Sequence, residues 1–179
     1  MSSELRVDAI KNTADTGVMT FNNDGVITKN KMIAFSVHLN TNHTHGGSGT
    51  NKITNWTDVT SSGGSYRIKN TRISGFDTTN SRFTAPVAGL YQMFFKPDLA
   101  TSLSTNWYLT MGINGSTRTW DIIESTTIAV NGGWMLPAVF DLNVNDYVEV
   151  YSAGGTTYTL NGDAAGYLWQ TWWHGYLVG

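Results

Sequence analysis

Alternation of apolar and other residues with a period of two limits the possible folds of this sequence more than any other feature. Large apolar side chains occupy every second position of residues 107–113, and Asn114-Gly115 follows directly. Such alternation places one set of side chains on one face of a β-strand. An Asn-Gly pair after an alternating run indicates a type I′ turn, because both central positions of that turn need a positive φ. The sequence therefore predicts a hairpin whose second strand contains Trp120 and Ile122.

The same pattern recurs along most of the chain, whereas amphipathic helical periodicity is hard to find. Gly, Asn and Asp interrupt the alternating runs about every eight to twelve residues, which is the strand spacing of a β-sandwich. Further strands are expected at Ala34–Leu39, Ile53–Val59, Gly89–Phe95, Trp134–Leu142, Tyr147–Tyr151 and Trp169–Val178. Seven Trp, eight Tyr and seven Phe provide the large side chains that fill the space between two sheets. The sequence predicts an all-β sandwich.

Charge is sparse, and this limits the classes of partner. Charged residues make up 13% of the 179 residues and the net charge is −2, whereas about 25% is typical. Without a basic surplus the chain has little with which to neutralise phosphates, so nucleic acid is not an expected partner. No apolar run approaches about 18 residues, so membrane insertion is not expected either. The lack of cysteine and of an apolar signal-peptide core favours synthesis in a cytoplasm.

The N-terminal residues differ from the rest. Apolar residues alternate over 5–9, and 23–25 read Asn-Asp-Gly, which predicts a turn. The two or three short strands expected here contain too few large apolar residues for a core. Such a segment is either disordered or buries its surface against copies of itself or a neighbouring protein. We predict an anchoring and trimerising segment over residues 1–31 and a head domain over 32–179.

One segment resembles a known family. After Asn80, residues 82–95 read Arg-Phe-Thr-Ala-Pro-Val-Ala-Gly-Leu-Tyr-Gln-Met-Phe-Phe. This resembles the pattern Asn-x-Arg-Phe-Thr-Ala-Pro-x-x-Gly-x-Tyr-x-Phe-x-Phe of C1q/TNF-superfamily head domains. The one difference is at the first Phe after the Tyr of the pattern, where this sequence has Met93. A protein core tolerates this exchange.

Two later segments resemble the same family. Residues 140–148 are similar to its Leu-x-Leu-x-x-Gly-Asp-x-Val pattern, with Asn145 at the Gly position. Asn suits that position because it tolerates the left-handed region better than most other residues. Residues 173–178 resemble the family's closing strand. The resemblance implies a jelly-roll sandwich, a homotrimer around an axis, and binding through exposed loops or grooves between subunits.

The alternating residues of the family segment have a physical interpretation of their own. Phe83, Tyr91, Met93 and Phe95 fall on one strand face, which we assign to the core or the trimer interface. Some family members bind Ca²⁺, but no cluster of Asp and Glu in this sequence matches such a site.

The N-terminus carries a second, shorter resemblance. Residues 5–14 and 17–26 are similar to the opening of fibre and appendage proteins of marine tailed phages. This implies a virion protein of the tail fibre or particle surface, held to other virion proteins by its N-terminal segment. The leading expectation is a tail fibre or fibre tip that contacts a host-surface glycan or outer-membrane protein. The alternative is an architectural role as capsid decoration, head fibre or tail adaptor.

Catalysis finds little support in the sequence. The Gly-x-Ser-x-Gly motif of a nucleophile elbow is absent. Asp24, Asp77 and Asp146 sit at expected turns, whereas a glycosidase needs two carboxylates that face one cleft. We expect no enzyme, and rank a glycan hydrolase below a cellular C1q-like lectin, which would carry a signal peptide or collagen-like repeats.

Three histidines, at positions 38, 43 and 45, form a cluster with metal-binding chemistry. The stretch 40–51 is rich in Asn, Thr and Gly and is expected to be a flexible loop. Near a threefold axis, His43 and His45 from each chain would form a transition-metal site, which resembles the His-x-His sites of other trimeric phage fibres. The alternative is a solvated loop. No other cofactor is expected.

The last strand is aromatic on both faces. Trp169 and Trp173 are expected on one face, and Trp172, His174 and Tyr176 on the other. One face should be core, so the second is covered as well, and a subunit interface is the favoured cover because aromatic residues concentrate in interface cores. The alternative is a platform on which carbohydrate stacks.

Overall fold

A computed structural model of the chain shows β-strands and no helix in the part it describes. That part comprises residues 9–11, 17–21, 27–29, 33–58, 75–100, 107–117, 120–125, 135–162 and 170–178. Within these ranges no helix is long and apolar enough to cross a membrane. The chain divides into two compact units, Met1–Met32 and Ile33–Gly179, which are described separately.

The first unit contains one small antiparallel sheet. Its strands are β1 (Ala9–Lys11), β2 (Gly17–Phe21) and β3 (Ile27–Lys29), in the order β1-β2-β3. The sequence predicted two or three short strands in this segment. Its role in anchoring or trimerisation stays a prediction.

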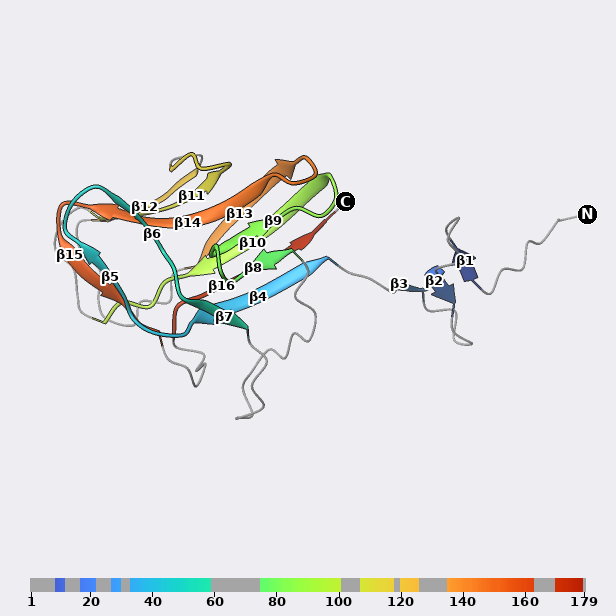
Figure 1. The fold of residues 1–179 in the computed structure, drawn as a ribbon, viewed down its shortest axis with the longest axis horizontal. Coiled ribbons are helices and arrows are strands. Elements are labelled where there is room, and N and C mark those ends of the chain that lie inside the picture. The colour runs from blue at the N-terminus through green and yellow to red at the C-terminus, as the bar shows by residue number, and fades with distance from the viewer. Residues whose placement is uncertain are drawn as a thin grey trace, which may run out of the picture. The chain divides into compact units, whose positions relative to one another are not determined.

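The second unit is a sandwich of two antiparallel sheets (Figure 1). The five-stranded sheet contains, in spatial order, β13 (Leu136–Leu142), β10 (Gly89–Lys96), β16 (Trp172–Leu177), β4 (Ala34–Leu39) and β7 (Trp56–Asp58). The six-stranded sheet contains β12 (Trp120–Ser125), β11 (Trp107–Ile113), β14 (Tyr147–Gly154), β9 (Arg82–Thr84) and β8 (Phe76–Asp77), with β6 (Thr50–Lys52) also paired to β14. A separate pair joins β5 (His43–Gly46) to β15 (Thr157–Leu160).

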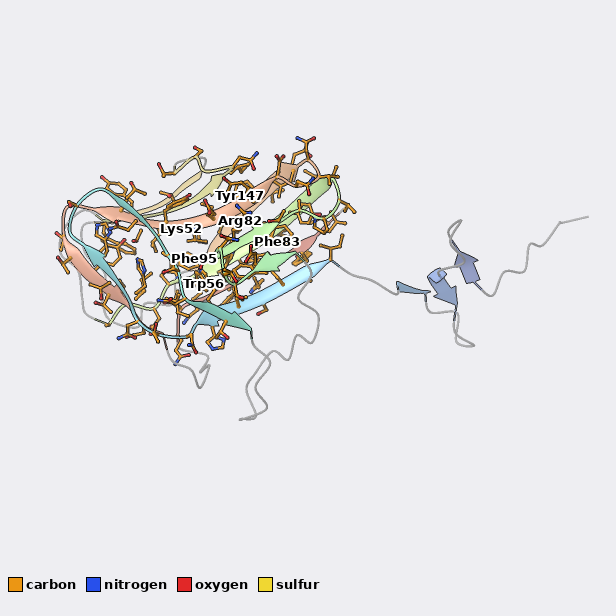
Figure 2. The ribbon with its side chains drawn as sticks, in the orientation of Figure 1. Lys52, Trp56, Arg82, Phe83, Phe95 and Tyr147 are labelled. Carbon is orange, nitrogen blue, oxygen red and sulfur yellow. The ribbon has the colours of Figure 1, made fainter. Side chains whose placement is uncertain are left out.

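The core lies between the two sheets and is built from the alternating residues. Burial along β13 alternates strictly between buried and exposed side chains. The predicted apolar face of Phe83, Tyr91, Met93 and Phe95 is at most 1% exposed throughout. Figure 2 shows Phe83 and Phe95 in the interior of the sandwich. Two sheets that each bury one face account for the fold.

Asparagine turns close two strand connections as predicted. Asn114 and Gly115 have φ values of 53° and 81°, and Asn145 has a φ of 71°. The two turns are also tied together, because Asn114 Nδ2 donates to Asp146 Oδ1 at 2.7 Å and Tyr147 N donates to Asn114 Oδ1 at 2.9 Å. The pairing between β11 and β12 reaches only as far as Met111 and Trp120. The Asn-Gly turn is therefore the tip of a connection that is longer than a two-residue hairpin turn.

The prediction of a flexible loop at 40–51 is wrong. Residues 43–46 form β5 and pair with β15, where His45 lies opposite Tyr158, and residues 50–52 form β6 and pair with β14. Composition favours a loop here, but the ladder partners are about a hundred residues further along the chain. Tertiary pairing therefore overrides local propensity.

Candidate functional site

One strand places aromatic side chains on both faces of the five-stranded sheet. In β16, Trp173 is fully buried in the core, and Gly175 beside it leaves room for the Phe35 ring, which a Cβ would meet at 2.7 Å. Trp172, His174 and Tyr176 alternate with these two and point to the opposite side of the sheet. Each of the three is only half-buried in the single chain.

Strand β10 extends this second face. Phe94 lies opposite His174, and Gln92 lies opposite Tyr176. We call Gln92, Phe94, Trp172, His174 and Tyr176 the outer aromatic face. Sequence reasoning singled out the members from β16 and missed Phe94. The sequence did contain an indication of its position. Phe94 is a large apolar residue between the buried Met93 and Phe95, so strand alternation places it on the opposite face of the sheet.

The rings of the outer aromatic face are ordered against one another. Trp172 and His174 stack with centroids 4.5 Å apart and an interplanar angle of 11°. Phe94 lies 4.9 Å from His174 and 6.3 Å from Tyr176. Tyr176 Oη donates a hydrogen bond of 2.8 Å to Gln92 Oε1. These contacts hold the rings in place without a partner, so little side-chain entropy remains to be lost when a second surface covers them.

Further apolar residues surround the outer aromatic face. Val139 pairs with Gln92 across β13 and is 55% exposed, and Pro137 pairs with Phe94. Leu90, one alternation before Gln92, is 46% exposed. Lys96, opposite Trp172, and Asp141, opposite Leu90, lie on the same side of the sheet. An aromatic patch bordered by apolar and a few charged residues is the kind of surface that proteins use for association.

Burial lowers the pKa of the His174 imidazole from its usual value near 6.5 to about 4. The unfolded chain therefore binds more protons than the folded chain between about pH 4 and 6.5. The contribution of the neutral His174 ring to the free energy of unfolding is complete above pH 6.5 and is lost as the pH falls through this window. We expect a loss of about 1–2 kcal/mol, after a discount for the partial exposure of the ring.

Replacement of His174 by phenylalanine keeps a stackable ring and removes the titration. Chemical denaturation at pH 7.5 and pH 4.5 should show a smaller decrease in the free energy of unfolding for His174→Phe than for the natural protein. The decrease should not vanish, because burial and the charge of His45 also lower the pKa of His43. Equal decreases in both proteins would contradict this assignment.

The two predicted metal ligands, His43 and His45, both take part in hydrogen bonds within the protomer. His45 is fully buried, accepts a hydrogen bond at Nδ1 from Asn51 Nδ2 at 3.0 Å, and donates from Nε2 to Gly154 O at 3.2 Å. Its ring also stacks on Tyr158, with centroids 4.9 Å apart. His43 is part-buried, and its Nε2 lies 2.9 Å from Ser152 Oγ.

This geometry does not fit a metal site at His45, because both of its ring nitrogens are already used within the protomer. Among the described residues, no group of three or more His, Cys, Asp or Glu side chains could hold a metal ion. His45 acts instead as a buried polar side chain that joins β5 to β14. Whether His43 lies near a threefold axis stays a prediction.

The residues predicted for the core or the trimer interface therefore separate into two sets. Phe83, Tyr91, Met93, Phe95 and Trp173 belong to the core between the sheets. Trp172 and Tyr176 belong to the outer aromatic face. Trp169 lies outside the described residues.

Solved structures show the same architecture. The crystal structure of murine APRIL at pH 8.0 aligns with a TM-score of 0.55 and 12% identity over 83% of this chain and 100% of that chain. The structure of murine APRIL at pH 8.5 aligns with a TM-score of 0.52 and 14% identity over 81% and 99%. The fold is a TNF-like jelly roll. This confirms the fold that the motif around residues 82–95 implied, and identities this low show the fold alone. The sequence matches no protein-family model and no curated protein.

Proposed function

We propose that this chain is a non-enzymatic, homotrimeric virion protein whose jelly-roll heads pack through the outer aromatic face. The observation that carries this proposal is the ordered set of rings on the outer aromatic face, each half-buried in the single chain. When neighbouring heads cover Trp172, Phe94 and Tyr176, apolar surface is removed from water. This burial stabilises the assembly by roughly 25 cal/mol per Å². A threefold arrangement closes on itself, so a contact between different surfaces of two heads ends in a trimer rather than a filament.

The virion assignment is supported by the sequence at the N-terminus. Residues 5–14 and 17–26 resemble the opening of phage fibre and appendage proteins, and the described part of this segment forms strands β1 to β3. In this proposal the N-terminal segment docks on other virion proteins and the jelly-roll heads project from the tail fibre or particle surface. The heads then contact the host surface.

Two measurements test this proposal in sequence. Light scattering of the purified full chain should give the mass of a trimer, and a stable monomer at micromolar concentration would contradict it. Electron cryomicroscopy of the particle should show the heads outermost at the tail or baseplate. Heads on the capsid lattice or buried between other virion proteins would favour the architectural role instead and would remove the host-contact part of the proposal.

A further inference from the structure

A hollow of about 620 Å³ opens at the edge of the sandwich. Of the described residues, three segments line it: the residues after β4, the start of β7 with the residue before it, and the turn between β8 and β9. The lining residues are Asn40, Thr41, Asn55, Trp56, Thr57, Thr78 and Thr79. Strand β7 is the last of the described strands in its sheet, and the hollow lies beside it. Its size is in the range of small-ligand sites.

The walls are made of neutral hydrogen-bonding side chains. Asn40 and Asn55 each offer an amide with two donors and an acceptor, and the four threonines each offer a hydroxyl that can donate or accept. Among the residues that the structure describes, no charged side chain lines the hollow. An anionic or cationic ligand binds best where an opposite charge meets it, and these walls provide none. They suit a neutral ligand that itself carries many donors and acceptors.

These groups are available for a ligand. In the part of the chain that the structure describes, no hydrogen bond is found for the side-chain amides of Asn40 and Asn55 or for the hydroxyl of Thr79. Other asparagines nearby are already engaged: Asn42 Oδ1 accepts from Gly162 N at 2.9 Å, and Asn80 Nδ2 donates to Asp77 Oδ2 at 2.6 Å. The free amides therefore gather in the hollow.

The walls are held in place by the backbone. Asn40 N donates to Asn55 O at 2.9 Å, which joins the end of β4 to the approach to β7. On the other side, Asp77 Oδ1 accepts from Asn80 N at 2.9 Å and closes the turn that carries Thr78 and Thr79. Asn80 thus donates to both carboxylate oxygens of Asp77. The Asp77 carboxylate is therefore engaged within the turn.

Trp56 contributes almost no accessible surface to the hollow and acts as a rigid support beneath it. This side chain is 3% exposed and donates its N–H to Ile53 O at 3.0 Å. Its ring centroid lies 6.1 Å from that of Phe95 (Figure 2). The centroid of Trp173 lies 5.9 Å away, and the two contacts fix the orientation of Trp56. Walls of amides and hydroxyls on a rigid support match the hydroxyl groups of a sugar, which donate and accept hydrogen bonds in the same way.

We propose that this hollow binds a neutral saccharide of the cell surface. The inference rests on the proposed function for the source of the ligand, since a host-contacting head meets surface glycans. Each hollow binds weakly because few groups converge on the ligand. Three copies on one trimer raise the overall affinity through effective concentration.

Binding is tested with the full-length protein on a glycan array that carries neutral, sialylated and sulfated oligosaccharides. Saturation-transfer NMR with the neutral glycan of strongest signal then compares variants. Asn55→Gly removes one amide and keeps the positive φ of 67° that position 55 requires. Thr57→Val removes one hydroxyl at nearly constant volume. Each variant should bind about tenfold more weakly, the effect of one lost hydrogen bond at about 1.4 kcal/mol.

The matched control is Thr44→Val, an exposed threonine on β5 that does not line the hollow. It should bind as the natural protein does, and thermal unfolding should show that all three variants are folded. No binding of any neutral glycan, binding of the anionic glycans alone, or equal binding by Asn55→Gly and the control would each overturn the proposal.

A cell-adsorption assay separates the two proposals. Attachment to host cells without any glycan signal leaves the proposed function intact and removes the saccharide site. Variants that lose glycan binding but still attach show that a protein partner, rather than this site, holds the head on the cell, which also overturns the inference. Failure of the natural protein to attach, with glycan binding present, removes the host-contact role and leaves the saccharide site standing.

Discussion

Replacement of Trp173 by alanine is expected to lower the free energy of unfolding by about 3–5 kcal/mol. Trp173 is fully buried, and its ring lies 4.9 Å from Phe35 and 5.4 Å from Phe76 in edge-on geometry. Alanine would leave a cavity where these rings meet, and the lining atoms would lose their contacts. A domain of this size is stable by about 5–15 kcal/mol, so the loss is a large share of the total.

The neighbouring residue provides the control for this prediction. Trp172 is identical in chemistry, but it lies on the outer aromatic face and is half-buried in the single chain. Chemical denaturation at protein concentrations low enough to keep the chain monomeric should show a loss below about 1.5 kcal/mol for Trp172→Ala. Equal losses for the two variants would show that the core does not lie on the Trp173 side of the sheet.

Replacement of Trp172 by aspartate is expected to abolish the trimer and to leave the head folded. In the proposed trimer the carboxylate would be buried against another head. Lys96 lies opposite it in β10, but the loss of water around a buried ion pair can exceed the attraction between the charges, so the substitution costs several kcal/mol at each of the symmetric contacts. In the monomer the same carboxylate stays in water. Light scattering should therefore report a monomer for Trp172→Asp at concentrations where the natural protein is a trimer, and circular dichroism should be unchanged.

The matched variant for assembly is Val144→Asp. Val144 is an exposed apolar residue, 53% accessible, in the turn between β13 and β14 rather than on the outer aromatic face. This variant should remain a trimer. A trimeric Trp172→Asp, or a Val144→Asp that dissociates equally, would place the interface elsewhere on the head. The monomeric variant would also show whether attachment to cells depends on three joined heads.

The sequence alone was enough to predict the strands and turns whose signals are local. Alternation identified the buried face of Tyr91, Met93 and Phe95, because a strand places every second side chain on the same side. The turns at Asn114 and Asn145 were predictable because few residues tolerate a positive φ. The segment 82–95 went further and indicated the jelly roll through its resemblance to a known family.

Histidine 45 shows where local reasoning failed. Its neighbours Asn42, Thr44, Gly46 and Gly47 are typical of loops, so a solvated or metal-bound imidazole was the natural expectation. The structure instead buries His45 against Tyr158 and Ser152, more than a hundred residues away. No pattern within a short window carries information about such a partner, since burial depends on which strand arrives next to it.

The sequence by itself determined that this chain is a β-sandwich, which residues alternate into its core, and where two of its tight turns lie, because these depend on backbone geometry over a few residues. Only the tertiary structure decided that Phe94 joins Trp172, His174 and Tyr176 in one ordered face, and that the free amides and hydroxyls beside β7 surround one hollow. Both arrangements join side chains from distant strands. Their positions depend on strand order and register, which are set by packing of the whole domain rather than by any single segment.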